Sequence, residues 1–221
     1  MNMADQIFFR PYVSSDMHDC CNLMQGTWLY EQIFPNMKKP INAYKFMLSS
    51  YLLESDYTKV AVRFDNDKNE EILGFIFGQT IKVNFFKCMQ YFLFSFVSTV
   101  LWLCGQYGNR GDIFKLLQKM KQDEYELFAD FTSKDAHLHL FFTSDKARGL
   151  GIGKKLFADF ENYCKEKNNS KIVLVTDTDC NYGFYDHIGF NCVKTQQGCF
   201  GVPQTELEKM QTKTFVYAKN I

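Results

Sequence analysis

Hydrophobic and polar residues alternate over several short stretches of the chain, and this two-residue period predicts β-strands. The run Ala136–Thr143 is the most regular of these stretches and is rich in aromatic residues. Six further strands are expected at Ile7–Pro11, Thr58–Phe64, Ile72–Gly78, Lys171–Thr176, Phe190–Thr195 and Thr214–Ala218. A polar cluster of turn-forming residues joins the second and third of these six strands and predicts a β-hairpin.

A helical period of apolar residues is clearest over Ile152–Lys167, where lysine and glutamate occupy the opposite face. Other helices are expected from the N-capping residues Ser14–Asp16 to about Tyr30, over Ile41–Leu53 and over Asn181–His187, after which Gly189 suits a left-handed cap. Because helices and strands are interleaved along the chain, the pattern indicates a mixed α/β domain with one core.

Residues 81–133 break this alternation with two longer helical patterns, Phe85–Cys104 and Asp112–Phe128. We expect a single domain, 1–221, that carries 81–133 as a helical insertion before its fourth strand. The first pattern approaches the ~20 residues of a membrane span, but Lys87 and several polar residues interrupt it. No span is expected, because one crossing would also place strands of a single sheet on opposite sides of a bilayer. A lid, a dimer surface and an interfacial helix remain as alternatives.

The composition is that of an ordinary globular protein, with 46% hydrophobic and 23% charged residues in a chain of 221. Lys+Arg and Asp+Glu are equal at 25 each, and without a basic stripe no nucleic-acid partner is expected. The first residues lack the features of a secretory signal, which favours a cytoplasmic location. The eight cysteines form no C-x-x-C pair, so buried, reduced thiols are expected and no metal site.

Three glycines and two basic residues separate the fourth strand from the next helix, in the sequence Arg148-Gly149-Leu150-Gly151-Ile152-Gly153-Lys154. Glycine lets the backbone approach a ligand closely, and the amides of the first helical turn point at it with the positive end of the helix dipole. The loop therefore favours an anion-binding site. A tight turn is the simpler interpretation, and the loop alone does not decide between the two.

A second pattern lies about thirty residues later, in Asn181-Tyr182-Gly183-Phe184-Tyr185-Asp186-His187-Ile188-Gly189-Phe190. The glycine loop resembles the R/Q-x-x-G-x-G/A signature of the GNAT superfamily of acetyl-CoA-dependent N-acetyltransferases, and the second pattern resembles that family's F-Y-x-x-x-G-F helix. The resemblance is strongest from His137 to Phe190. It implies an α/β (α+β) fold with a mixed, twisted, mostly antiparallel sheet of about seven strands, flanking helices, and a splayed central pair that admits acetyl-CoA.

The resemblance also implies which residues are functional. The cofactor-binding set is Phe142, Thr143, Arg148, Gly149, Leu150, Gly151, Ile152, Gly153, Lys154, Asn181 and Tyr185. Thr143 would offer backbone groups to pantetheine, and the amides of the glycine loop would hold the pyrophosphate. Tyr185 is expected to be the general acid that protonates the CoA thiolate, since the usual phenol pKa of about 10 lies close to that of a thiol.

The base that deprotonates the acceptor amine is less closely defined. Many members of the family carry a glutamate on the splayed strand, and His137 stands at that position, six residues before Thr143. Histidine suits the role because its usual pKa of about 6.5 lies near the operating pH. His139 shares the same face of the strand. The alternative is that both histidines are only structural residues, and His187 is expected at the surface.

The function expected from these residues is transfer of an acetyl group from acetyl-CoA to a primary amine in a ternary complex, without a metal. An acetyl-enzyme at Cys180 is not expected, because Asp177 and Asp179 would disfavour its thiolate. A non-catalytic acyl-CoA-binding module is the alternative, and the histidine in place of the family's glutamate favours it. The aromatic insertion either walls the acceptor site or packs on the sheet or on a second subunit, which leaves a homodimer open.

Overall fold

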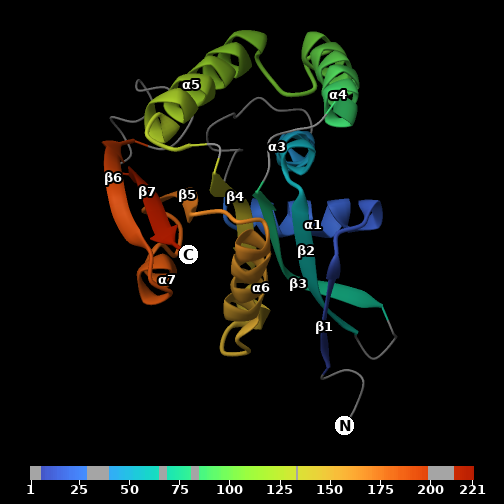
Figure 1. Cartoon of the computed structure of the whole chain (residues 1–221). Helices are drawn as coiled ribbons and strands as arrows, with labels where there is room; N and C mark the ends of the chain where they lie inside the picture. Colours follow the sequence, from blue (N-terminus) through green and yellow to red (C-terminus); the bar gives the residue numbers. More distant parts are fainter. Residues whose placement is uncertain (1–5, 29–39, 65–68, 81–84, 133, 199–211) are drawn as a thin grey trace.

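The computed structural model describes residues 6–28, 40–64, 69–80, 85–132, 134–198 and 212–221. Within them, one seven-stranded sheet has the order β1-β2-β3-β4-β5-β7-β6 (Figure 1). Its strands are β1 (Ile7–Pro11), β2 (Tyr57–Phe64), β3 (Glu70–Gln79), β4 (Asp135–Thr143), β5 (Lys171–Asp177), β6 (Asn191–Gln197) and β7 (Lys213–Asn220). All neighbours are antiparallel except β4 and β5. The predicted α/β (α+β) fold and its mixed sheet are confirmed.

Helices cover both faces of this sheet. They are α1 (Met17–Gln25), α3 (Ile41–Glu54), α4 (Phe85–Leu103), α5 (Arg110–Phe128), α6 (Ile152–Glu166) and α7 (Gly183–His187). α1 and α3 pack on one face and α6 on the other, so that each face has its own hydrophobic cluster. Within the described residues, no helix is both long enough and apolar enough to cross a membrane.

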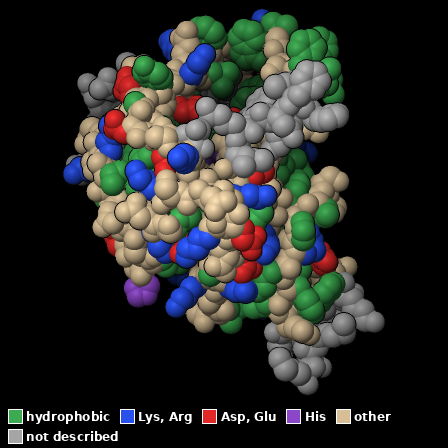
Figure 2. Space-filling view, viewed as in Figure 1, with side chains coloured by type: hydrophobic (Ala, Val, Ile, Leu, Met, Phe, Trp, Pro, Cys, Tyr) green, Lys and Arg blue, Asp and Glu red, His purple; other side chains and the backbone are tan. Residues whose placement is uncertain are grey.

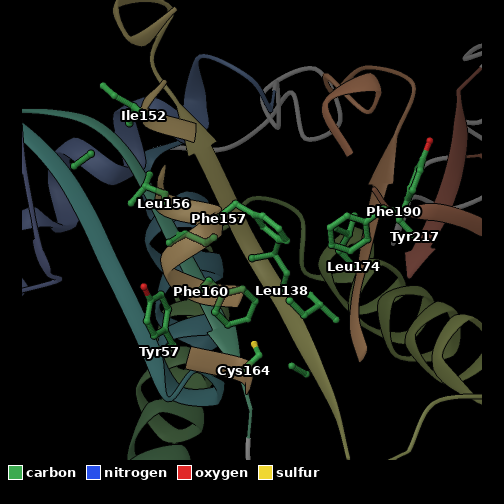
Figure 3. Packing of buried hydrophobic residues seen from close by; sticks show 14 of the residues in the cluster. Tyr57, Leu138, Ile152, Leu156, Phe157, Phe160, Cys164, Leu174, Phe190 and Tyr217 are labelled. Atoms are coloured by element: carbon green, nitrogen blue, oxygen red, sulfur yellow. The ribbon is translucent and has the colours of Figure 1, made fainter. Parts of the chain in front are cut away.

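The core under α6 follows from the helical spacing of its apolar residues (Figure 3). Ile152, Leu156 and Phe160 are fully buried and meet Leu138 of β4 and other sheet residues in one cluster. Gly78 of β3 allows this close approach, because a Cβ there would lie 2.4 Å from Cζ of Phe160. The amphipathic pattern thus seats α6, and with it the loop that precedes it, at a fixed position on the sheet.

Two expectations from the sequence were wrong in detail. The first helix, expected to reach about Tyr30, ends at Gln25, where the amide of Thr27 donates to the carbonyl of Met24 three residues back and so tightens the last turn. Tyr30 itself lies outside the described residues.

Buried thiols were expected, but some of the cysteines are exposed. Cys20, Cys21 and Cys164 are buried, whereas Cys104 and Cys192 are exposed, because each lies where a helix or an edge strand leaves the core. The structure does not describe the side chains of Cys88 and Cys199.

The two expected helices of the insertion are present as α4 and α5, between β3 and β4. They lie together at one end of the sheet, opposite the end where α6 begins (Figure 1). α4 packs on α3 through Phe94, whose ring stacks on Phe46 at 5.4 Å. α5 reaches β4 through Phe128 and β6 through Asp123, which accepts a 3.1 Å hydrogen bond from Gln196. The insertion is therefore anchored on both halves of the sheet.

The packing of α6 leads to a stability prediction. Phe160→Ala should lower the free energy of unfolding by about 3–5 kcal/mol, since it removes a fully buried ring and leaves a cavity. Urea unfolding followed by circular dichroism measures the loss. Tyr125→Ala is the matched control, because Tyr125 is 79% exposed and its removal should change the midpoint little. Equal losses in the two variants would contradict this account of the core.

Candidate active site

β4 and β5 are neighbours only over their first residues. Their parallel register runs from Asp135 opposite Lys171 to Leu138 opposite Leu174. Beyond Leu138, residues 140–143 stay paired with β3, while residues 175–177 of β5 stay paired with β7. Within the described residues, no strand lies between these two facing edges. The splayed central pair is confirmed, and its backbone groups face a region where a ligand can hydrogen-bond to them.

A β-bulge marks the place where the strands separate. Phe77 is opposite Leu140 and Gly78 is opposite Leu138, so His139 is an extra residue in β4. A bulge turns side chains relative to the regular alternation. Leu138 accordingly joins the cluster under α6, whereas Leu140 joins the cluster under α1 and α3.

The glycine loop follows the open end of β4. The amide of Ser144 donates to the carbonyl of Leu73, and a 3-10 turn, η3 (Asp145–Ala147), leads into the loop. Gly149 and Gly151 have φ values of +76° and +68°, a left-handed conformation that favours glycine. A Cβ at either position would meet nothing within 4 Å, so the surrounding space is open. The loop thus presents the first amides of α6, a 15-residue helix, to an open region.

Side chains of the loop divide into exposed and buried groups. Arg148 is exposed and pairs with Asp145 at 2.8 Å, an ion pair that contributes little because both groups are solvated. Leu150 and Lys154 are also exposed. Ile152 is buried in the core and can offer a ligand only its backbone. The expected binding positions are therefore mostly backbone groups, as an anion cradle requires.

Gly153 lies in the first turn of α6 beside the end of β4. A Cβ there would be 3.4 Å from Cζ of Phe141 and 3.5 Å from Cγ2 of Thr143. Phe141 in turn meets Phe184 of α7, with 5.4 Å between ring centroids. The structure brings the two sequence motifs together at this point, from segments on opposite sides of the strand separation. Phe142 points to the other face, where its ring meets Trp28.

Tyr185 projects from α7, the short helix of the second motif. It is half-buried, and its ring contacts Phe190 and Tyr217. Burial raises the pKa of its phenol well above the usual value, and the nearby Cys180 and Asp177 raise it further. The phenol therefore keeps its proton at neutral pH.

Other residues of the second motif are more exposed. Asn181 and His187 are exposed, as was expected for His187. Gly189 has φ +89° and ends α7 as predicted.

His137 and His139 face α3 and α5. His137 packs against Phe128 with ring centroids 4.9 Å apart, and burial lowers its pKa, although Asp135 opposes the shift. The imidazole of His137 is thus neutral at pH 7. The two histidine rings are 6.2 Å apart. Both lie on the face opposite α6, on the side covered by the insertion.

Two residues beside His139, Tyr51 and Glu54, were not predicted from the sequence. Tyr51 of α3 stacks on His139 at 5.4 Å, and Nε2 of His139 lies 3.9 Å from Oε2 of Glu54. Tyr51 and Glu54 are one helical turn apart, and β4 is about ninety residues further along the chain. Only the packing of α3 on the sheet joins them. Gly78 was the available signal for the bulge, since glycine inside a strand often marks one.

Cys180 lies near Tyr185 but is poorly suited to nucleophilic attack. Burial raises the pKa of its thiol to about 12, and the charge of Asp177 contributes to the rise. The thiolate, which is the reactive form, is therefore scarce at neutral pH. In the part of the chain that the structure describes, no group of three or more His, Cys, Asp or Glu side chains is arranged to hold a metal ion.

Comparison with known proteins shows which proteins this chain is similar to. Residues 115–210 match the family model described as an acetyltransferase (GNAT) domain. No curated protein matches the chain. Many solved structures share the fold, at low sequence identity.

Three of these structures illustrate the similarity. Ard1 from Thermoplasma volcanium has a TM-score of 0.54 and 14% identity, and the match covers 97% of this chain and 97% of that one. The ribosomal-protein-S18-alanine N-acetyltransferase from Escherichia coli has a TM-score of 0.51 and 10% identity, covering 98% and 94%. A structure of the NatC complex bound to Gag peptide and CoA gives 0.50 and 14%, covering 98% and 99%.

The chain therefore shares its fold with these solved structures. The family-model match over residues 115–210 agrees with the resemblance that the two sequence motifs suggested.

The raised pKa of Cys180 has a chemical consequence. Iodoacetamide at pH 8 should modify the exposed Cys104 and Cys192 much faster than Cys180, whose thiol is mostly protonated at that pH. Mass spectrometry of the tryptic peptides over time gives the three rates. Modification of Cys180 as fast as that of Cys104 would show that its thiol is accessible and reactive.

Proposed function

We propose that the protein transfers the acetyl group of acetyl-CoA directly to a primary amine. The observation that carries this proposal is the separation of β4 from β5, which ends at the left-handed glycine loop on one side and at Tyr185 on the other. An extended chain with amide groups fits between two strand edges, and an anionic group fits the start of α6. We take 1–221 as one catalytic domain with 81–133 inserted.

The donor site is formed mainly by backbone. Thr143 and Phe142 offer the edge of β4 to pantetheine, and the amides from Arg148 to Lys154 hold the pyrophosphate. The open space around Gly149 and Gly151 supports this assignment, since a bulky ligand group can come close to the loop there. Asn181 lies at the start of the second motif, beside the cofactor arm. Acetyl-CoA supplies the activated acetyl group when it is bound.

Proton transfer is assigned to two side chains. His137 accepts the proton of the acceptor amine, and its lowered pKa keeps the imidazole neutral and able to do so. Tyr185 donates its phenolic proton to the departing sulfur, and its raised pKa keeps the phenol protonated until then. The protonated thiol of Cys180 supports direct transfer in a ternary complex over an acetyl-enzyme.

The acceptor enters, on this proposal, from the face of β4 that α3 and α5 cover. His137 and His139 point to that face, together with Tyr51 and Glu54. Phe128 of α5 contacts His137, which supports the prediction that the insertion forms a wall of the acceptor site. The acceptor is proposed only as a primary amine.

Binding of acetyl-CoA tests the proposed role of the glycine loop in holding the pyrophosphate. Acetyl-CoA at about 100 times its dissociation constant should stabilise the fold by roughly 2.7 kcal/mol, measured as a rise in unfolding temperature. Gly153→Val should abolish most of this rise, because a branched side chain would fill the space beside Phe141 and Thr143. Gly111→Val, in the first turn of α5, is the matched control and should keep the ligand-induced rise. No rise in the unaltered protein would overturn the proposal.

Measuring turnover tests the proposed role of Tyr185 as the general acid. Free thiol released from acetyl-CoA in the presence of a panel of primary amines should appear with the unaltered protein. Tyr185→Phe should lower kcat about 100-fold or more while acetyl-CoA binding persists, since a general acid contributes 10²–10⁴-fold. Full turnover in this variant would remove Tyr185 from the mechanism. Donor binding without any thiol release by the unaltered protein would instead support a non-catalytic acyl-CoA-binding module.

A further inference from the structure

α4 presents an apolar stripe to the solvent. Seven of its large hydrophobic side chains are between 43% and 73% exposed: Met89, Phe92, Leu93, Phe96, Val97, Val100 and Leu103. They recur at three- and four-residue intervals and therefore form one face of the helix. Figure 2 shows hydrophobic side chains on the outer surface of this end of the molecule, at the upper right. We call this face the α4 stripe.

The α4 stripe is not the face by which the helix is attached. Phe94 stacks on Phe46 of α3, and Tyr107, just after α4, packs on the same Phe46 ring at 5.5 Å. α4 is thus apolar on two sides, one of which has its partner within the chain. A contiguous exposed apolar surface of this kind is typical of an interaction site.

The chemistry of the stripe limits what can cover it. No Asp, Glu, Lys or Arg occurs from Cys88 to Asn109. Helices that lie on anionic membrane surfaces carry lysine and arginine along their polar face, and α4 has none in this range. An uncharged stripe that meets an identical stripe brings no like charges together. Such a face is self-complementary about a twofold axis, as the interface of a symmetric dimer must be.

The size of the stripe is also that of a dimer contact. A large aromatic residue can bury roughly 150–250 Å², the smaller aliphatic residues of the stripe bury less, and between 43% and 73% of each residue is accessible. The stripe therefore offers on the order of 700 Å², against the roughly 800 Å² per partner of a standard stable interface. Phe92 and Phe96, at 73% and 62% exposure, lie near its middle and are the natural anchors.

We infer that α4 packs against α4 of a second copy of this chain, through the α4 stripe and about a twofold axis. The position of the insertion is compatible with this arrangement. α4 lies at the end of the sheet opposite the glycine loop, so a second copy there leaves the start of α6 accessible (Figure 1). This inference does not depend on the proposed acetyl transfer.

Sedimentation equilibrium of the full chain over a range of micromolar concentrations tests the inference. The unaltered protein should show twice the chain mass of 25.9 kDa. The double variant Phe92→Glu/Phe96→Glu should weaken association by at least about 30-fold, because a single anchor residue typically contributes that much. Val193→Glu is the matched control, since Val193 is 54% exposed on β6 and should leave the dimer intact. Circular dichroism of each variant verifies the fold.

Three results would overturn the inference. One is a monomer for the unaltered protein at 100 µM or about that concentration. Another is a dimer of undiminished affinity in the folded double variant. The third is a monomer that sediments with phosphatidylcholine vesicles and loses this binding in the double variant, which would assign the α4 stripe to a lipid surface.

Discussion

The separation of β4 from β5 after Leu138 and Leu174 is the constraint on which the rest of the structure depends. Two parallel strands that stop pairing inside a sheet leave backbone donors and acceptors that must find other partners. Regular strands would close this edge and exclude any ligand. The bulge at His139, next to the pair of Leu138 with Gly78, changes which residues face each side at the point where pairing stops.

Each half of the sheet is held by its own contacts, which is why the separation does not disrupt the fold. β4 remains bonded to β3 as far as Thr143, and β5 remains bonded to β7 as far as Asp177. α6 connects the two halves and buries its apolar face on the sheet. At the opposite end, α5 also contacts both halves of the sheet. Its Phe128 packs on His137 of β4, and its Asp123 accepts a hydrogen bond from Gln196 of β6. The insertion therefore closes one end of the sheet while the glycine loop lies at the other.

Local patterns predicted most of the elements correctly. The strands, the long helix after the glycine loop, and the two helices of the insertion all follow from period and turn residues. The end of α1 did not, because the turn at Gly26 is stabilised by hydrogen bonds to Met24 that no sequence period reveals. The exposure of Cys104 and Cys192 was not predicted either, because burial of a thiol depends on which segments pack over it.

By itself, the sequence determined the order of the elements and supplied the two motifs that we propose as the donor side of the candidate site. Both motifs are contiguous in the chain, and a glycine loop before an amphipathic helix specifies its own geometry through left-handed φ values and free amides. Only the tertiary structure decided the surroundings of His137 and His139, because Tyr51, Glu54 and Phe128 come from distant segments. It also decided that α4 turns an apolar face to solvent. A hydrophobic period shows that a face is apolar, but what covers that face depends on packing between segments far apart in the chain.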